Sequence, residues 1–439
     1  MTSVARPLPF LDPLAALAVF AAEPFALLFD SAALDQRGRF SYLCVRPRRV
    51  IEAQAFDGTD AFAQVAEALG PPRPSLPGLP PFQGGAAGLF AYDLAHQVER
   101  LPRHQPEETG WPALAVGLFD AVVAWDHQQG LAWVLGTAEA ADALVEALAG
   151  VTPLAPPDWS VTGRFAADLT AEAYGARVAR VIDYIHAGDI FQANLSQRFR
   201  ATLPVGLSPL TLYRRLRALA PGPFSAYFGL GDAALLSVSP ERFLAVDAEG
   251  RVEARPIKGT RRRGSTPEED QALADELLAS VKDRAENLMI VDLLRNDLSR
   301  SCQMGSIRVP QLCSLEHFAA VHHLVSAVEG VLAPGLGPLD LLRAAFPGGS
   351  ITGAPKVRAM EIIAELEDAR RGPFFGSIAW MGYNRAMDSS ILIRTMSVAG
   401  DTVLAQAGGG IVADSDPVAE VAETMVKAAA LLASLEGRG

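Results

Sequence analysis

The spacing of hydrophobic and polar residues predicts a chain that mixes strands with helices. A strand-like run at Ala121–Trp125 and a helix-like run at Ala138–Leu148 lie in the first third of the chain. The clearest helix has Thr170 as its N-cap, apolar side chains every three or four residues, and Gly188 as its stop. The sequence contains no internal repeat. Its length of 439 residues, half of them apolar, is enough for a large globular protein.

Two further helical patterns carry pairs of carboxylates. One helix is expected at residues 267–294 and holds Asp283 and Glu286, and a second, at the C-terminus, holds Glu420 and Glu423. A spacing of three residues puts each pair on one face of its helix. The spacing alone leaves two interpretations open, a charged surface or a set of metal ligands.

The C-terminal helix is expected to begin at Asp416 and Pro417 and to bury one apolar stripe. This stripe consists of Val418, Val421, Met425, Ala428 and Leu432. Glu420, Glu423 and Lys427 then project away from the buried side.

Polar and apolar residues alternate along a strand that starts at Phe191. Its polar face is made up of Gln192, Asn194 and Ser196, followed by Arg198. A solvated outer surface and the wall of a pocket explain this face equally well.

A β-hairpin is expected to bring a lysine towards a glutamate. Strands at residues 241–246 and 251–258 are joined by a four-residue turn. A symmetric turn places Glu241 opposite Pro256, so that Lys258 becomes a diagonal neighbour of Glu241 at roughly 7 to 8 Å between Cβ atoms. The amine and the carboxyl could then share one substrate, and an ordinary surface ion pair is the alternative.

An arginine and three glycines form another candidate site. Arg394 is expected in a strand at residues 390–398, on a face with apolar neighbours, where it needs an anion. That anion is either a structural carboxylate or a substrate carboxylate. The strand that returns from a hairpin turn leads to Gly408, Gly409 and Gly410, which can expose backbone amides and adopt positive φ angles.

A proline-rich loop at Val151–Trp159 is the expected boundary between two regions. Residues 1–150 form an N-terminal α+β region of a composite fold, and residues 165–437 form the catalytic region. Polar residues set within apolar patterns become frequent after residue 160, so the chemistry is expected there.

Composition narrows the class of protein. The chain has 439 residues, half of them apolar, and its net charge of −12 argues against sequence-independent binding of nucleic acid. Its three cysteines, Cys44, Cys302 and Cys313, indicate neither a disulfide framework nor a zinc site. No uninterrupted apolar run approaches the roughly 18 residues that span a bilayer. A protein of the reduced cytosol that acts on small molecules fits this composition.

The segments Ser239–Phe243 and Pro256–Arg261 resemble the chorismate-utilising enzymes. Motifs of this kind occur in the expected order over roughly residues 165–437, and a thinner resemblance rests on Gly84–Asp93. Lys258 stands where the anthranilate synthases of the family usually carry alanine. The resemblance therefore favours the aminodeoxychorismate synthase branch, the route toward 4-aminobenzoate and folate.

The resemblance implies a magnesium site on the two acidic helices. By this match Glu286 and Glu423 bind Mg²⁺ directly, and Asp283 and Glu420 act through water. Carboxylate oxygens suit this hard cation, which usually keeps several waters. The ion would hold the ring carboxylate of chorismate.

Other matches imply contacts with the substrate. Arg394 and Gly410 match groups that hold the enolpyruvyl carboxylate, and Ser350 matches a hydroxyl near the bound ring. His323 matches an active-site histidine. Gln192 stands where relatives that add water to chorismate carry a lysine base, which argues against hydration chemistry.

One position departs from the family pattern. Trp380 stands where the family commonly has a tyrosine that could contact the substrate carboxylate. An indole N–H is still a hydrogen-bond donor.

The family chemistry assigns roles to Glu241 and Lys258. Glu241 donates a proton as the 4-hydroxyl leaves, Lys258 attacks ring C2, and ammonia then adds at C4 and expels the lysine. A lysine that only positions water or ammonia is the milder alternative. None of the cysteines lies in the setting of a glutaminase nucleophile, so a separate glutamine amidotransferase subunit is expected to supply the ammonia.

The resemblance also implies the fold: α+β, with two large antiparallel sheets packed face to face and helices outside, as in anthranilate synthase component I. Two other functions stay open. One is an anthranilate synthase component I, which makes an aromatic product and releases pyruvate. The other is a non-catalytic subunit that binds chorismate.

Overall fold

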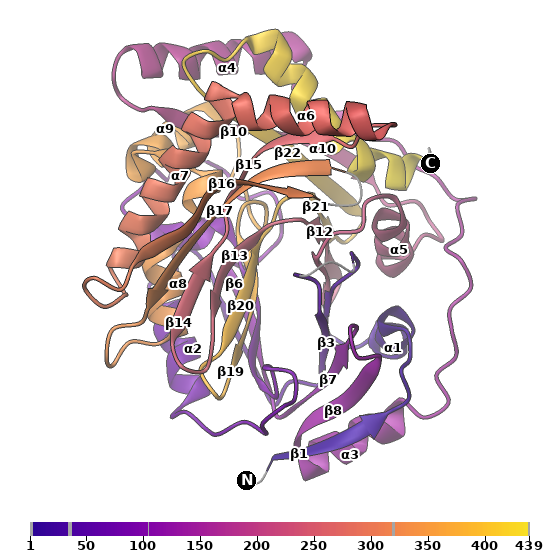
Figure 1. Ribbon diagram of the computed structural model, residues 1–439. Helices are drawn as coiled ribbons and strands as arrows, with labels where there is room; N and C mark the ends of the chain where they lie inside the picture. The colour runs from indigo at the N-terminus through magenta and orange to yellow at the C-terminus, as the bar shows by residue number, and fades with distance from the viewer. Residues whose placement is uncertain (1–2, 34–36, 104, 318–320, 438–439) are drawn as a thin grey trace.

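Two large β-sheets with helices around them make up the structure, a computed structural model that describes residues 3–33, 37–103, 105–317 and 321–437 (Figure 1). The α-helices are α1 (Pro13–Phe20), α2 (Ala61–Leu69), α3 (Ala138–Ala147), α4 (Ala171–His186), α5 (Pro209–Leu219), α6 (Pro267–Ala279), α7 (Val281–Ser299), α8 (Pro338–Ala345), α9 (Lys356–Leu366) and α10 (Pro417–Glu436). Two short 3-10 helices are η1 (Tyr92–Gln97) and η2 (Gly349–Ile351).

The first sheet has 12 strands in the described residues, and its pairs are antiparallel. Its order is β1 (Ser3–Leu8), β8 (Leu131–Thr137), β7 (Ala121–Asp126), β3 (Phe40–Val45), β2 (Phe25–Asp30), β11 (Phe224–Leu230), β12 (Ala233–Ser239), β21 (Thr395–Ala399), β22 (Thr402–Ile411), β10 (Gln192–Thr202) and β18 (Gly353–Ala354), with β9 (Ala166–Ala167) beside β10.

The second sheet has 10 strands in the described residues and is also antiparallel. Its order is β15 (Ile257–Arg262), β17 (Val321–Val331), β14 (Arg251–Ala254), β13 (Arg242–Val246), β20 (Met387–Ile391), β19 (Ser377–Gly382), β5 (Gly85–Phe90), β6 (Leu114–Phe119) and β4 (Arg49–Ala53), with β16 (Arg308–His317) beside β17. Each sheet contains strands from before and after the loop Val151–Trp159, so the two regions of the chain complete each other's sheets.

Alternating residues of the strands fill three large hydrophobic cores. In β2, Phe25 and Leu27 face the second sheet, whereas Ala26 and Leu28 face the outer helices. Both faces of this strand are therefore apolar, which explains its continuous hydrophobic sequence. Helices α1, α3, α5 and α10 cover the outer face of the first sheet, and α2, α7 and α8 cover that of the second (Figure 1). The expected α+β fold of two large antiparallel sheets with helices outside is confirmed.

The single helix expected at 267–294 is two helices. Ser280 ends α6 with extended backbone (φ −64°, ψ 108°) and begins α7, where its hydroxyl accepts a hydrogen bond from the amide of Asp283 at 3.2 Å. A serine three residues before an acidic residue is an N-cap signal. The break lets α7 take its own direction against β15 and β17.

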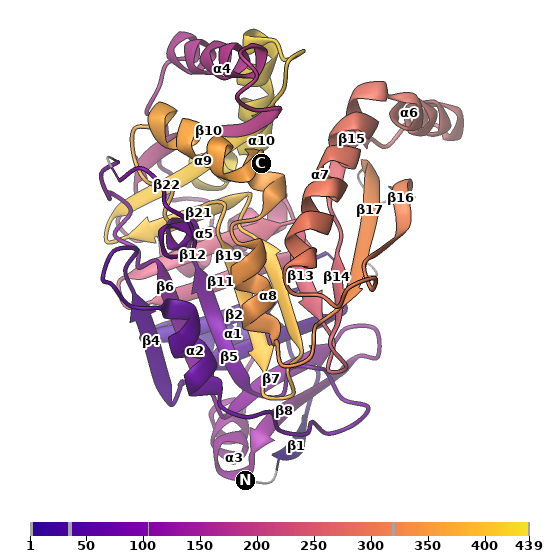
Figure 2. The same ribbon diagram turned by 90° about the vertical axis from the view of Figure 1, so that its left-hand side faces the viewer.

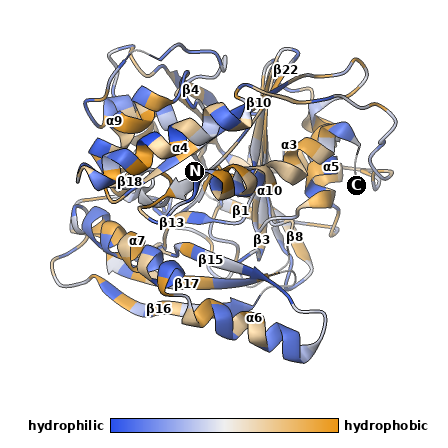
Figure 3. Ribbon diagram, turned by 90° about the horizontal axis from the view of Figure 1, so that it is seen from above, coloured by the Kyte–Doolittle hydropathy of each residue, from blue (hydrophilic) through white to orange (hydrophobic). Residues whose placement is uncertain are grey.

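The buried stripe predicted for the C-terminal helix holds only in part, since Ala428 is buried and Val421 and Leu432 are partly buried against hydrophobic cores. Asp416 caps α10 as expected, but Val418 and Met425 are 77% and 43% exposed, and Glu420 and Thr424 are buried. In the view from above, which is coloured by hydropathy, α10 carries hydrophobic residues, drawn in orange (Figure 3). The helix packs on α4 and on the glycine segment of β22, where small and polar side chains fit the close approach.

A buried ion pair ties β10 to the segment after α9. The Arg371 guanidinium donates to both carboxylate oxygens of Glu367, at 2.8 and 2.7 Å, and to the carbonyl of Asn194 at 2.6 Å. Glu367 in turn accepts the amide of Ser196. The two charged side chains are only 2% and 8% exposed, so each depends on the other for its solvation.

Arg371→Met is expected to lower the free energy of unfolding by about 3 to 5 kcal/mol, because it leaves the Glu367 carboxylate buried and unpaired. Urea denaturation followed by circular dichroism measures the change. The double variant Arg371→Met/Glu367→Leu should regain much of the loss. An equal loss in the single and double variants would contradict this account.

Candidate active site

Lys258 and Glu241 meet through a serine rather than across a hairpin. β13 and β14 pair only beside their turn, with Val246 opposite Val252, and β15 leaves this hairpin to pair with β17. The expected pairing of Glu241 with Pro256 is therefore wrong, because the chain turns away at the proline, which cannot donate to a sheet. Instead, Ser350 Oγ donates to Glu241 Oε1 at 2.9 Å, and Lys258 Nζ donates to the Ser350 carbonyl at 3.4 Å.

The turn that holds Ser350 is fixed from two sides. Ser350 lies in η2, and Asn194 of β10 donates to its carbonyl at 3.2 Å and to that of Thr352 at 3.3 Å. The sequence pattern places Asn194 on a polar face but does not predict this role. Asp297 of α7, which binds Lys356 Nζ at 2.7 Å just after the turn, is also not predicted. Asp297 gave no sequence signal, because it occupies an unremarkable position in a helical pattern.

Burial acts on the carboxyl and the amine in opposite directions. It raises the pKa of Glu241, although the Lys258 charge and the Ser350 hydrogen bond act against this shift. It lowers the pKa of Lys258, against the opposing charge of Glu241. Both shifts favour the neutral forms, a protonated acid and an uncharged amine.

Gln192 presents unused hydrogen-bonding groups. Its side chain is 1% exposed, and neither its amide nitrogen nor its amide oxygen has a partner among the described residues. Buried polar atoms are normally paired. A side-chain carbon on Gly410 would lie 2.7 Å from Gln192 Nε2, so the glycine leaves the space around this amide open.

The three glycines belong to β22 and pair with β10, so the expectation of positive φ angles at Gly408, Gly409 and Gly410 is wrong. The close approach of neighbouring segments to β22 explains why these positions are glycines. A Cβ atom at Gly408 would lie 2.0 Å from the Leu195 carbonyl oxygen, and one at Gly409 would lie 3.1 Å from Glu420 Oε2. The glycines therefore allow β10 and α10 to approach β22 closely.

Arg394 lies at the crossing between the two sheets. The strand expected at 390–398 is wrong, because β20 ends at Ile391 in one sheet and β21 begins at Thr395 in the other. Arg394 takes a left-handed conformation there, with φ +49°, which costs a non-glycine residue of order 1 kcal/mol. Its exposed guanidinium has neither a hydrogen bond nor an ion pair with the described residues.

His323 lies near this arginine on β17. Its Nδ1 is 2.9 Å from Thr260 Oγ1, on the neighbouring strand β15. Burial lowers the pKa of His323 to about 4, and the charges of Arg37 and Arg394 add to the effect. The imidazole is therefore neutral at neutral pH.

The four predicted metal ligands lie on α10, near the top of the molecule in Figure 2, and on α7, which runs from the middle of the molecule towards the top. Burial raises the pKa of both Glu286 and Glu420, and the charge of Glu423 adds to each shift, so the carboxylates of the two helices are electrostatic neighbours. The described residues do not form a closed group of three or more metal-binding side chains. The donor set nevertheless suits Mg²⁺, because a dication between the helices would relieve this repulsion.

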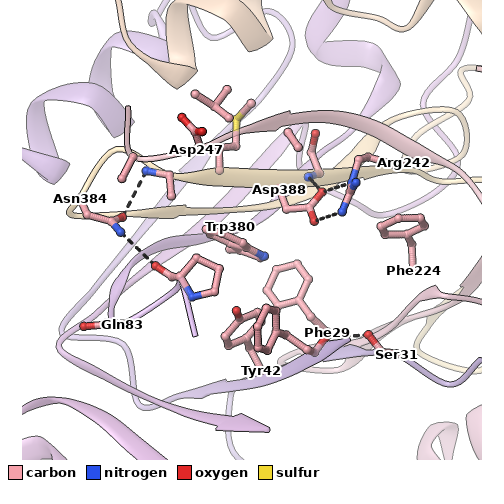
Figure 4. A pocket seen from close by; sticks show the side chains of 18 of the residues that line it. Phe29, Ser31, Tyr42, Gln83, Phe224, Arg242, Asp247, Trp380, Asn384 and Asp388 are labelled. Carbon is pink, nitrogen blue, oxygen red and sulfur yellow. Dashed lines mark hydrogen bonds and ion pairs between the residues drawn. The ribbon is translucent and has the colours of Figure 1, made fainter. Parts of the chain in front are cut away.

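Trp380 lies in a separate cavity of about 490 Å³ (Figure 4). Its indole stacks on Phe82, with ring centroids 5.0 Å apart, and meets Tyr42 edge-on at 5.6 Å. Arg242 and Asp388 form a bidentate ion pair in the same wall. The described residues that line this cavity include neither Lys258 nor Arg394. Trp380 therefore packs against Phe82 and Tyr42 in the wall of this cavity.

Comparison with known proteins gives relatives along almost the whole chain. Anthranilate synthase component 1 of Thermus thermophilus is 41% identical over 430 residues, which cover 94% of this chain and 92% of the relative. Aminodeoxychorismate synthase component 1 of Klebsiella aerogenes is also 41% identical, over 433 residues that cover 94% of each chain.

Solved structures share the fold. Anthranilate synthase component I from Streptococcus pneumoniae superposes with a TM-score of 0.80 at 32% identity, over 90% of this chain and 92% of that one. The menaquinone-specific isochorismate synthase from Escherichia coli has a TM-score of 0.75 at 19% identity, over 99% and 94% of the two chains, which shows the common fold. The family model described as chorismate binding enzyme matches residues 25–433. This chain therefore belongs to the chorismate-binding enzyme family.

Proposed function

We propose that this chain is component I of an aminodeoxychorismate synthase, which converts chorismate and ammonia to 4-amino-4-deoxychorismate. The observation that carries the proposal is the partly buried Lys258 amine, linked through Ser350 to the Glu241 carboxyl. Overall identity does not separate the two aminating activities of the relatives, since both kinds are 41% identical to this chain. A lysine at position 258, where anthranilate synthases usually carry alanine, favours amination at C4.

The proposed reaction needs an acid and a nucleophile, and the pKa shifts suit both. Glu241 gives its proton to the 4-hydroxyl, which leaves as water, while the neutral Lys258 amine attacks C2 and the two conjugated ring double bonds shift towards C4. Ammonia then adds at C4, both double bonds shift back, and the bond between C2 and Lys258 breaks. The Glu241 carboxylate takes up the surplus proton of the new ammonium group. The carboxyl must be protonated and the amine uncharged at the start, which are the forms that burial favours.

The substrate would be held by groups that have free hydrogen-bonding capacity. Arg394, with its unpaired guanidinium, and the backbone at Gly410 would bind the enolpyruvyl carboxylate. The unpaired amide of Gln192 would contact the substrate, and Ser350 and His323 would lie beside the ring.

Glu286 and Glu423 would bind Mg²⁺, with Asp283 and Glu420 acting through water. When bound, the ion would neutralise the ring carboxylate of chorismate in a site that is otherwise rich in carboxylates. In this proposal the chain's own residues carry out every proton transfer.

The ammonia would come from a glutamine amidotransferase subunit. Two relatives are each named component 1 of a synthase, which supports a second component. The chain's cysteines, Cys44, Cys302 and Cys313, are all buried and so unsuited to glutamine hydrolysis.

The test is to incubate the purified chain with chorismate, Mg²⁺ and ammonium at mildly alkaline pH and to identify the products by chromatography and mass. Aminodeoxychorismate without anthranilate is the expected outcome. Anthranilate with pyruvate would instead indicate an anthranilate synthase component I, which the Thermus relative keeps open. Unchanged chorismate, with binding demonstrated, would favour the non-catalytic subunit.

Arg394→Lys is expected to raise the KM for chorismate by about 10- to 100-fold with a smaller change in kcat, because a point charge replaces the fork that binds a carboxylate in two places. Steady-state kinetics at saturating ammonium measures both constants. Arg385→Lys is a matched control, since Arg385 also has positive φ but lies in the turn between β19 and β20. An unchanged KM in Arg394→Lys would argue against carboxylate binding.

A further inference from the structure

Lysine is rare in this chain, and its few positions surround the candidate site. Of 38 basic residues, 34 are arginines, and the four lysines are Lys258, Lys282, Lys356 and Lys427. Lys258 binds the Ser350 carbonyl and Lys356 binds the Ala345 carbonyl, on either side of the same turn. Lys282 and Lys427 pair with carboxylates of α7 and α10. All four lysines therefore lie beside Ser350 or beside the carboxylates of α7 and α10.

The two cations differ in how firmly they hold a carboxylate. A guanidinium grips it with two parallel hydrogen bonds in a fixed plane, whereas an ammonium is a compact point charge on a flexible stem. An ammonium can therefore be exchanged for another cation more readily. Positions 282 and 427 accordingly suit a cation that must leave.

Helix stability does not explain Lys282. It is the second residue of α7, where the helix dipole favours negative charge. Its Nζ lies 4.0 Å from Glu286 Oε1, and lysine followed by glutamate four residues later is the weaker order for such a pair.

Lys427 approaches the same carboxylates from the other helix. Its Nζ is 2.6 Å from Glu423 Oε1 and donates to the Gly408 carbonyl at 3.1 Å. The carbonyl gives Lys427 a second partner that remains if Glu423 turns towards a metal ion. Lys282 is 56% exposed, so water can take over its solvation when it moves away.

We propose that Lys282 and Lys427 are exchangeable counterions of the carboxylate cluster formed by Glu286, Glu420 and Glu423. They neutralise the cluster before a divalent cation binds and withdraw when the cation arrives. Lys282 is thus a positioning residue that sets the affinity for the ion. This inference rests on the magnesium site of the proposed function.

The test measures binding of Mn²⁺, a spectroscopic substitute for Mg²⁺, to the full chain without chorismate, from the loss of the free-ion signal in electron paramagnetic resonance. Lys282→Gln is expected to tighten binding by about three- to tenfold, because one positive charge near a dication is removed in a screened, partly exposed site. Lys282→Arg should weaken binding, because a guanidinium would hold the carboxylates more firmly.

Arg295→Gln is the matched control. Arg295 lies on the same helix, is 54% exposed and pairs with Asp292 at 3.0 Å, much as Lys282 is placed beside Glu286. It lies nine residues beyond Glu286, about 13 Å along the axis and farther than the roughly 8 Å screening length at physiological salt. Its replacement should leave Mn²⁺ affinity unchanged.

The outcomes separate the inference from the function on which it rests. Tighter binding in Lys282→Gln, with Arg295→Gln unchanged, supports the exchange of counterions. Equal affinity in the parent and in Lys282→Gln would overturn this inference alone. A parent chain that binds no Mn²⁺ would overturn the magnesium site as well.

Discussion

Lys258→Ala should reduce the formation of aminodeoxychorismate by about 10³-fold or more, because the proposed nucleophile is lost. The fold should survive, since Asn194 still donates to the Ser350 carbonyl that Lys258 leaves. Rapid-quench kinetics with chorismate and ammonium measures the rate. In the parent, mass spectrometry of the quenched reaction should detect a substrate adduct on the peptide that contains Lys258.

The matched control for this experiment is Arg251→Ala. Arg251 lies on β14, the strand just before Lys258, and its side chain is 71% exposed, so its loss removes a cation without touching the site. Its activity should equal that of the parent. Full activity in Lys258→Ala would remove the covalent role. A loss of only about tenfold without an adduct in the parent would favour a lysine that positions ammonia.

Glu241→Gln should reduce turnover by about 10²- to 10⁴-fold, because an amide cannot give up a proton to the departing hydroxyl. The substitution keeps the shape and leaves an oxygen to accept the Ser350 hydroxyl, so chorismate binding should change little. Turnover and KM are measured separately to show this. Glu249→Gln, in the exposed turn of the same hairpin, is the control.

The pH dependence of the reaction rate provides a second test of Glu241 as the acid. Burial raises its pKa, so its reactive protonated form persists to higher pH than in water and is lost as pH rises further. Burial lowers the pKa of Lys258, so its reactive neutral form appears at lower pH and is lost as pH falls further. The parent should show a bell-shaped profile and Glu241→Gln a single limb. An unchanged bell would assign the acid to another group.

Local sequence patterns predicted helix ends and the polar face of one strand, and the resemblance to the family implied the two-sheet architecture. Thr170 and Asp416 cap their helices as expected, and the polar strand that begins at Gln192 lies beside the turn that holds Ser350. These features follow from local rules of capping and alternation, which act within a few residues. The proximity of Lys258 to Glu241 was predicted from a hairpin register that the structure does not contain, and Ser350 links the two residues instead.

Sequence did not predict how the chain crosses between sheets. A run of alternating residues reads as one strand whether it stays in one sheet or changes sheet, so Arg394 could not be placed at the crossing. The hairpin failed for a related reason, since β14 and β15 both pair with β17, which is distant in sequence. On α10 the apolar residues Val418 and Met425 face outward. The side of the helix that packs on β22 carries Glu420, for which Gly409 leaves room.

The scarcity of lysine has a consequence for how this protein can be chemically marked. Acetylation and other acylations of side-chain amines need a lysine, and this chain offers only four, all of them around Ser350 or the carboxylate cluster. Apart from the N-terminus, the surface is nearly inert to such reagents, because guanidinium groups stay protonated. Any covalent modification of a lysine in this protein is therefore also a change to its candidate active site.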